Sequence, residues 1–201
     1  MRCTVGYCWR GKRYHLHSSS DQNVTDAQNN GPSHIEASQM TDDQELLTAY
    51  HEAGHVVMAV CLGGTIVRAS IEPADDDGPD RYGETVTQWP RLPKAQILQA
   101  EVEISLAGPF AEMIYQNEPA RIDSVPQWSA DWQRARSSAA QLAQPELSAE
   151  QILQRASISI LRVMNSDNGW AAVAAVSDLL SAHQTIEHDE CLEAIQFWLP
   201  S

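Results

Sequence analysis

Two histidines and a glutamate stand close together in the stretch Thr48–Val60, TAYHEAGHVVMAV. His51 and His55 are four positions apart, so on an α-helix they lie on one face, one turn from each other. Two imidazoles placed this way can bind one metal ion from a single rigid element. Glu52 is rotated by roughly 100° from His51, which puts its carboxylate at the flank of that face. This His-Glu-x-x-His pattern is typical of zinc metalloproteases, in which the glutamate is the general base.

The spacing works only if a helix carries these residues, and the flanking sequence predicts one. Thr41-Asp-Asp-Gln44 is a capping-box pattern, which predicts a helix start at Thr41. Apolar residues then recur at helical spacing until Gly63-Gly64, where a glycine C-cap would end the helix. Gly54 costs about 1 kcal/mol relative to alanine inside a helix, which indicates a close backbone neighbour. The alternative is a core helix that carries histidines without a metal, but a buried polar triplet without a partner would cost several kcal/mol.

The periodicity changes after this helix. Residues 65–73 alternate β-branched and polar side chains, 74–80 supply a turn and 81–89 resume strand character, which predicts a hairpin or two strands of a small sheet. Helical patterns occupy the remainder, with a predicted interruption near Gly108-Pro109. They cover 95–116, 130–143 with Ser129 as N-cap, 148–164, 168–182 and 187–198. The predicted fold class is mainly α (α+β), a helical zincin-like domain with a small β-hairpin after the histidine helix.

Composition narrows the class of protein. The chain has 13 lysines and arginines against 27 aspartates and glutamates, a formal net charge of −14. This balance argues against nucleic acid as a partner, because phosphate binding needs clustered basic residues. No apolar run approaches the roughly 20 residues that span a bilayer, and the start of the chain lacks the apolar stretch of a secretory signal. We therefore expect a cytoplasmic protein without a membrane span.

Residues 1–40 are expected to be a disordered leader, with 41–201 as the folded domain. The leader is rich in serine, asparagine, glutamine and aspartate, and it has too few large apolar residues to offset its ordering entropy. It contains four side chains of metal-ligand type, but their spacing matches no standard zinc module. These are Cys3, Cys8, His15 and His17. Cys61 and Cys191 sit among apolar neighbours and are expected to be buried.

The segment Ala49–His55, AYHEAGH, resembles the zinc helix of the FtsH-type peptidase family, which is the proteolytic domain of membrane-anchored AAA+ proteases. Weaker similarities extend the resemblance over about residues 41–198. They lie in Ile71-Glu-Pro73, Gly83-Glu-Thr85, LAGPFAEMIY and Ser129-Ala-Asp131. The chain departs from the family in having no phosphate-binding Gly-x-x-x-x-Gly-Lys-Ser/Thr loop, and in having Leu-Ala-Gly-Pro-Phe in place of a Gly-Gly pair. The resemblance thus implies a peptidase domain without an ATPase of its own.

The resemblance also implies a third zinc ligand. A segment beginning at Ser129 is similar to the one that supplies this ligand in the family, so Asp131 is expected to bind zinc together with His51 and His55. A catalytic zinc site has three protein ligands and one open position. Glu112 is the second candidate, and it is expected rather to hydrogen-bond a ligating imidazole. Lower-ranked candidates are Glu101, Glu103 and Asp123, while His183 and His188 are expected to be surface or core histidines.

The residues and the resemblance together predict a soluble zinc-dependent metalloendopeptidase. Zn²⁺ would be its cofactor, Glu52 its general base, and peptides or unfolded proteins its substrates, paired with an edge of the 65–88 hairpin. The alternative is a non-catalytic, zinc-stabilised module that binds peptides or a partner such as a separately encoded ATPase, although structural zinc needs no general base. A site-2-type intramembrane protease is disfavoured because membrane spans are missing. The family's domains form hexameric rings, so the resemblance also makes a homo-oligomer an expectation.

Overall fold

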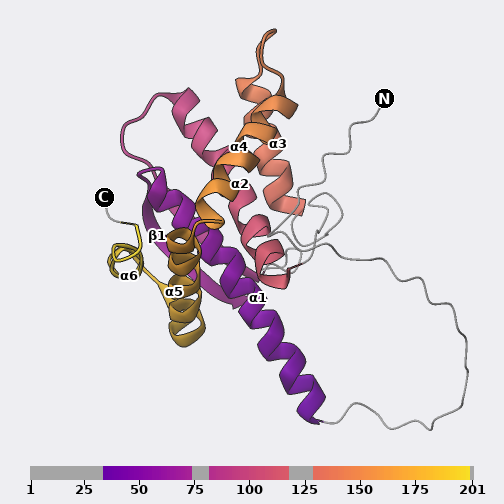
Figure 1. The fold of residues 1–201 in the computed structure, drawn as a ribbon, viewed down its shortest axis with the longest axis vertical. Helices are drawn as coiled ribbons and strands as arrows, with labels where there is room; N and C mark the ends of the chain where they lie inside the picture. The colour runs from indigo at the N-terminus through magenta and orange to yellow at the C-terminus, as the bar shows by residue number, and fades with distance from the viewer. Residues whose placement is uncertain (1–33, 74–81, 118–128, 200–201) are drawn as a thin grey trace, which may run out of the picture.

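A computed structural model describes residues 34–73, 82–117 and 129–199, and within these ranges it contains six helices and three strands (Figure 1). The helices are α1 His34–Cys61, α2 Lys94–Gln116, α3 Ser129–Leu142, α4 Ala149–Met164, α5 Asp167–His183 and α6 His188–Ile195. The strands are β1 Thr65–Pro73, β2 Tyr82–Gln88 and β3 Thr185–Ile186. The prediction of a mainly α (α+β) fold with a small β element after the histidine helix is confirmed.

Helix α1 begins earlier than the sequence pattern predicted. It starts at His34 rather than at Thr41, so Thr41 is not its N-cap. The predicted start is wrong because nothing upstream of Thr41 stops a helix until Pro32, the nearest preceding proline or glycine. Residues 1–33, which include the four N-terminal cysteine and histidine candidates, lie outside the described ranges.

The carboxyl end of α1 is closed by the glycine pair, as predicted. Gly63 has a φ of 81°, in the left-handed region that favours glycine. Its N–H donates to the Val60 carbonyl at 3.0 Å, and the Gly64 N–H donates to the Ala59 carbonyl at 2.8 Å. This pair of bonds is a Schellman motif. It satisfies two carbonyl groups at the helix end and turns the chain directly into β1.

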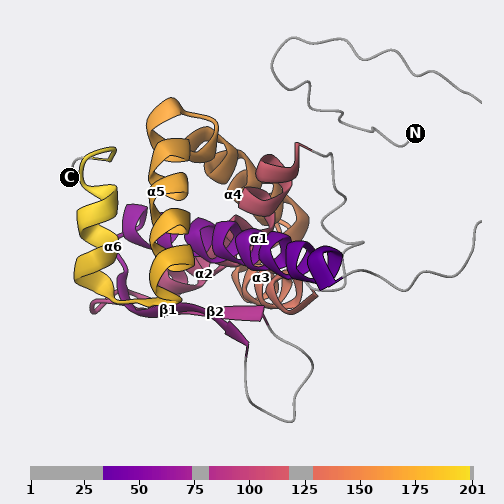
Figure 2. The same ribbon diagram turned by 90° about the horizontal axis from the view of Figure 1, so that it is seen from below.

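The two predicted hairpin strands are present in a small sheet. β1 pairs antiparallel with both β2 and β3, so the strand order is β2-β1-β3. The predicted turn at 74–80 lies outside the described ranges. Strand β3 was not predicted because two residues are too few to show a period of two. The helices lie on one side of the sheet (Figure 2), and both long strands contact α1. The inner face of β2 can therefore reach the histidine helix.

Helix α1 packs closely against α2, and a glycine allows the short distance between them. A Cβ at Gly54 would lie 2.6 Å from the Ala107 carbonyl oxygen, so the close backbone neighbour expected there is present. The predicted interruption of α2 is wrong, because the helix runs unbroken through Pro109. Proline removes an N–H donor and is disfavoured inside helices. Here Pro109 is buried, and the packing of α2 against α1, α3 and α4 overrides the local propensity.

The hydrophobic core surrounds the carboxyl-terminal half of α1 and holds it in place. It is built from side chains of α1, α2, α4 and α5 that are almost completely buried, among them Met58, Leu106, Ile160 and Leu180. Burial of each such side chain contributes about 1.5–3 kcal/mol. The histidines are thus carried by an element that is anchored on several sides.

Two further expectations concern the cysteines and membrane spans. Cys191 is buried as expected, but Cys61 is exposed, because it ends α1 at the turn into the sheet. Among the helices of the described ranges, none is both long and apolar enough to cross a membrane.

Candidate metal centre

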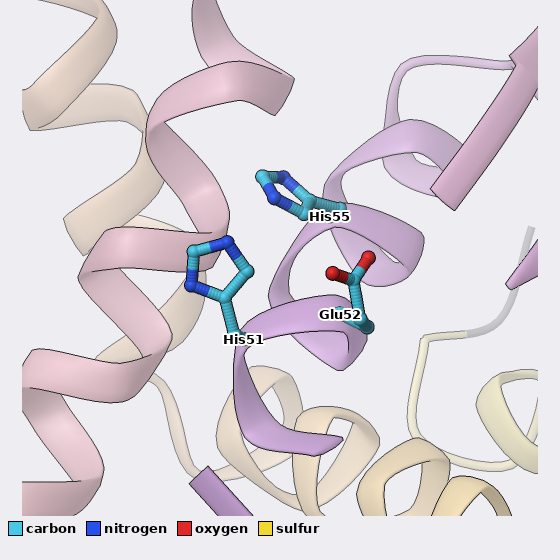
Figure 3. A group of neighbouring side chains, drawn as sticks. All are labelled: His51, Glu52 and His55. Carbon is cyan, nitrogen blue, oxygen red and sulfur yellow. The ribbon is translucent and has the colours of Figure 1, made fainter. Parts of the chain in front are cut away.

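Helix α1 presents His51, Glu52 and His55 from consecutive turns (Figure 3). Both imidazole rings point toward α2, and the Glu52 carboxylate lies to one side of them. One ring nitrogen of each histidine and one carboxylate oxygen of Glu52 lie within 4.8 Å of one another. The helical spacing therefore brings the three side chains together, and this buried group can hold a metal ion.

Each imidazole is oriented by a hydrogen bond through its Nδ1 atom. His51 Nδ1 lies 3.2 Å from Glu112 Oε2, and His55 Nδ1 lies 2.7 Å from the backbone carbonyl oxygen of Ile104. Because a carbonyl or a carboxylate can only accept, Nδ1 is the donor in both rings. In the neutral rings Nε2 is then the atom left to bind a metal, and outer hydrogen bonds of this kind are typical of ligating histidines. Glu112 occupies the position expected of an imidazole partner.

Asp131, in the first turn of α3, meets both Nε2 atoms. Its Oδ2 lies 3.1 Å from His51 Nε2 and 3.7 Å from His55 Nε2. Arg134, one turn further along α3, places Nη1 3.7 Å from the other carboxylate oxygen, Oδ1. Three ligand-type atoms thus converge, although His51 and Asp131 are 80 residues apart in the sequence. The structure brings together the three residues that sequence reasoning named as metal ligands.

The geometry fits a metal ion with nitrogen and oxygen ligands. Ligand atoms bound at about 2.0–2.1 Å to a tetrahedral zinc lie roughly 3.3 Å from one another. The two distances from Asp131 Oδ2, 3.1 and 3.7 Å, bracket this value. Gly108 of α2 leaves room beside these atoms, because a Cβ there would lie 2.4 Å from His55 Nε2 and 2.7 Å from His51 Nε2. Two imidazoles and one carboxylate are also a donor set that suits several divalent transition metals, zinc among them.

Opposite charges dominate the electrostatics of the metal-free centre. Burial disfavours a charged His51 ring, but hydrogen bonds to Asp131 and Glu112 outweigh this and raise the pKa of His51 to about 10. Burial also disfavours a charged Asp131, but the two histidines hold the pKa of its carboxyl well below the usual range. At neutral pH the metal-free centre is therefore an imidazolium–carboxylate pair. A metal that replaces the His51 proton meets a carboxylate that is already ionised.

Glu52 is buried against the sheet, with only 4% of its surface exposed. Its Oε2 accepts a 2.7 Å hydrogen bond from Thr85 Oγ1 of β2. Burial raises the pKa of Glu52, and positive charge on His55 and His51 lowers it in part. A carboxyl group with a raised pKa beside a metal-binding cluster has the properties of a general base.

Sequence reasoning did not assign a role in the site to Ile104, Gly108 or Thr85. Ile104 contributes its backbone carbonyl, which residue type cannot signal. For Gly108 the signal was a glycine inside a helical pattern, which indicates close approach of a neighbour just as it does for Gly54. Thr85 was noted as part of a predicted strand and of the Gly83-Glu-Thr85 similarity, but neither gave it a role in the site.

The lower-ranked carboxylates have other partners. Glu101 Oε2 accepts a 2.8 Å hydrogen bond from Ser138 Oγ of α3. Glu103 Oε1 accepts one of 3.0 Å from Gln99 Nε2 of the same helix. Asp123 lies outside the described ranges. None of these contacts joins a candidate to the metal-binding group.

The two late histidines also lie apart from this group. His188 Nδ1 accepts a 3.2 Å hydrogen bond from the Ile66 N–H, which ties the start of β1 to α6. His183 is exposed at the end of α5. Within the described ranges, neither of these histidines contacts His51, Glu52, His55 or Asp131.

No family model matches the chain, and no curated protein sequence matches it. The resemblance of Ala49–His55 to the FtsH-type zinc helix therefore stays a prediction. A functional proposal has to rest on the geometry of the site itself.

Proposed function

We propose that this protein is a zinc-dependent metalloendopeptidase whose site is similar to that of the FtsH-type peptidases. The observation that supports the proposal is the convergence of His51 Nε2, His55 Nε2 and Asp131 Oδ2 beside the buried carboxylate of Glu52. Three protein ligands leave a fourth position on a tetrahedral ion, which distinguishes catalytic zinc sites from structural ones. A structural site would also have no use for an acid–base group at its side.

The residues have separate roles in the proposed reaction. His51, His55 and Asp131 hold the ion, which when bound polarises a peptide carbonyl and acidifies water. Glu52 takes the proton of the attacking water on its carboxylate and passes it to the nitrogen of the leaving amine. Burial raises the pKa of Glu52 toward the range in which such a base works best. The hydrogen bonds at the two Nδ1 atoms keep both rings in the ligating tautomer.

The proposed substrate is an extended peptide or a segment of an unfolded protein. In the described part of the sheet, β2 is an outer strand, and it contacts Glu52 through Thr85. A peptide that pairs with this edge would be bound through its backbone, with little dependence on its sequence. It would also pass close to the general base.

Two measurements on the full chain test the proposal. The purified protein should contain about one zinc per chain, and Asp131→Ala should lose it. Glu52→Gln should keep the zinc but lose at least ~100-fold in the rate of cleavage of an unfolded protein or a peptide library. Glu101→Gln is a matched control that should change neither the zinc content nor the rate of cleavage, because the Glu101 carboxylate is hydrogen-bonded to Ser138. A zinc-loaded wild type that cleaves no faster than Glu52→Gln would instead favour the non-catalytic binding module.

A further inference from the structure

Strand β2 contacts both carboxylate oxygens of Glu52. Gly83 and Thr85 are alternate residues of this strand, so their side-chain positions fall on the same face, the one that meets α1. Thr85 Oγ1 donates the 2.7 Å hydrogen bond to Oε2. Gly83 lies against Oε1, because a Cβ there would come within 2.6 Å of this oxygen and 2.8 Å of Glu52 Cγ. One strand thus supplies a donor for one oxygen and a space for the other.

The backbone of β2 has an uncommon conformation at this point. Gly83 has a φ of 90°, which side chains of L-residues rarely adopt. Glycine is required here for two independent reasons, the positive φ and the close approach of Glu52. The space for the Glu52 carboxylate therefore depends on the glycine at position 83 of β2.

We infer that Thr85 is a positioning residue that fixes the carboxylate of Glu52 for its work as general base, with Gly83 providing the space; this inference rests on the proposed function. A glutamate side chain has several rotamers, and a base displaced by about 1 Å can lose on the order of 100-fold in rate. The short hydrogen bond from the Thr85 hydroxyl to Oε2, together with the limited space that β2 leaves at Oε1, selects one of these rotamers. The rings of His51 and His55 are oriented by contacts with α2 and α3 rather than with β2, so the inference concerns Glu52 alone.

The strand offers a matched control for Thr85. Thr87 is two residues further along β2, and its Oγ1 is buried with no hydrogen-bond partner among the described residues. Thr85→Val and Thr87→Val make the same change, from a hydroxyl to a methyl group on a β-branched side chain. Only the first of them removes a donor from Glu52.

Steady-state cleavage by the zinc-loaded full chain is the first test. Thr85→Val should keep its zinc and lower kcat about tenfold with KM changed less than about twofold, because the interaction acts on the base rather than on substrate binding. Thr85→Ser, which keeps the hydroxyl, should stay within about threefold of the wild type, and Thr87→Val should match the wild type. The inference is overturned if Thr85→Val cleaves like the wild type, or if Thr85→Ser is impaired as strongly as Thr85→Val.

Thermal unfolding of the metal-free full chain gives a readout that does not depend on activity. Thr85→Val should lower Tm by about 2–4 °C in the wild-type background and leave it unchanged in a Glu52→Ala background. If the wild type shows no peptidase activity, the proposed function fails, while this cycle still decides whether Thr85 holds Glu52. Equal Tm shifts in the two backgrounds would overturn the inference.

Discussion

The two sides of α1 hold their functional groups by different means. On the side of α2 and α3, His51 and His55 meet oxygen atoms of two other helices, and most of these oxygens are charged. On the side of the sheet, Glu52 meets the hydroxyl of Thr85 and the backbone of Gly83, both from one strand. The histidines thus meet mostly charged groups from segments that are distant in the sequence. The Glu52 carboxylate meets uncharged groups of a single strand, β2.

This difference implies that substitutions can reduce metal affinity and turnover separately. Changes on the side of α2 and α3 alter the atoms that a metal would touch or the bonds that orient them, so metal affinity should fall first. Changes on the sheet side leave those atoms in place, so turnover should fall while the metal stays bound. Three substitutions test this division, and for each we expect either metal affinity or turnover to change.

Gly108→Ala should have the largest effect on the ligand side. The new Cβ would lie 2.4 Å from His55 Nε2 and 2.7 Å from His51 Nε2, so at least one ring has to move away from its ligating position. We expect metal affinity to fall by more than ~100-fold. The fold should survive, since alanine is favoured over glycine inside a helix by about 1 kcal/mol. Metal titration together with circular dichroism checks both statements, and a variant that binds metal normally would contradict the tight packing of Gly108 on the rings.

Glu112→Gln should have the next largest effect. Loss of the charge at His51 Nδ1 weakens the bond that orients this ring, and changes of such outer partners reduce metal affinity about 10–100-fold. Glu101→Gln changes the same residue type on the same helix without touching either histidine. Metal affinities of the two variants, measured in parallel, should therefore differ by at least ~10-fold. If they are equal, the Glu112 contact does not tune the ligand.

The sequence was sufficient for the local part of this site and not for the rest. The i, i+4 spacing of His51 and His55 fixes their common face, and Gly63-Gly64 fixes the helix end, because both follow from backbone geometry alone. The approach of Asp131 to His51 depends on how α3 packs on α2, a tertiary contact that no local pattern encodes. The resemblance of the segment beginning at Ser129 to the segment that supplies the third ligand in the FtsH-type family, rather than any periodicity, pointed to that residue.

The errors have physical causes of the same kind. The segment starting at Thr41 has the residue types of an N-cap, yet α1 extends back to His34. A capping pattern only competes with a longer helix, and no proline or glycine lies between His34 and Thr41 to end the helix there. Pro109 reads as an interruption, yet tertiary packing keeps α2 intact. The hydrogen bond from His55 to the carbonyl of Ile104 leaves no trace in residue type, because every residue has a carbonyl.

Metal binding should release about one proton per ion at pH 7–8. In the metal-free protein the pKa of His51 is raised from 6.5 to about 10, so its ring is protonated in this range and must become neutral to bind a metal. Affinity should accordingly rise up to about tenfold per pH unit until about pH 10. Calorimetric titration in two buffers of different ionisation enthalpy counts the protons. A count near zero would show that His51 is neutral before the metal arrives.

The same shift contributes to the pH dependence of the stability of the metal-free protein. Because the folded-state pKa of His51 lies above its ordinary value of 6.5, the protonated ring stabilises the fold fully below about pH 6.5. This contribution is lost as pH rises through about 10. Tm of the metal-free chain should therefore fall over that window, and a His51→Gln variant should show a smaller fall.

Gly83→Ala should have the smallest effect on the metal and a distinct effect on turnover. Its φ of 90° strains any L-residue, and its Cβ would lie 2.6 Å from Glu52 Oε1, so the variant combines backbone strain with displacement of the base. Gly63→Ala is the matched control, because Gly63 has a φ of 81° and a Cβ there would meet nothing within 4 Å. Both variants should lose a few °C in Tm from a strain of roughly 1–2 kcal/mol, and both should bind zinc like the wild type. Only Gly83→Ala should also lower kcat several-fold. Equal kcat values for the two variants would mean that the position of the Glu52 carboxylate does not depend on β2. The proposed difference between the two sides of α1 would then be supported only by the variants that affect metal binding.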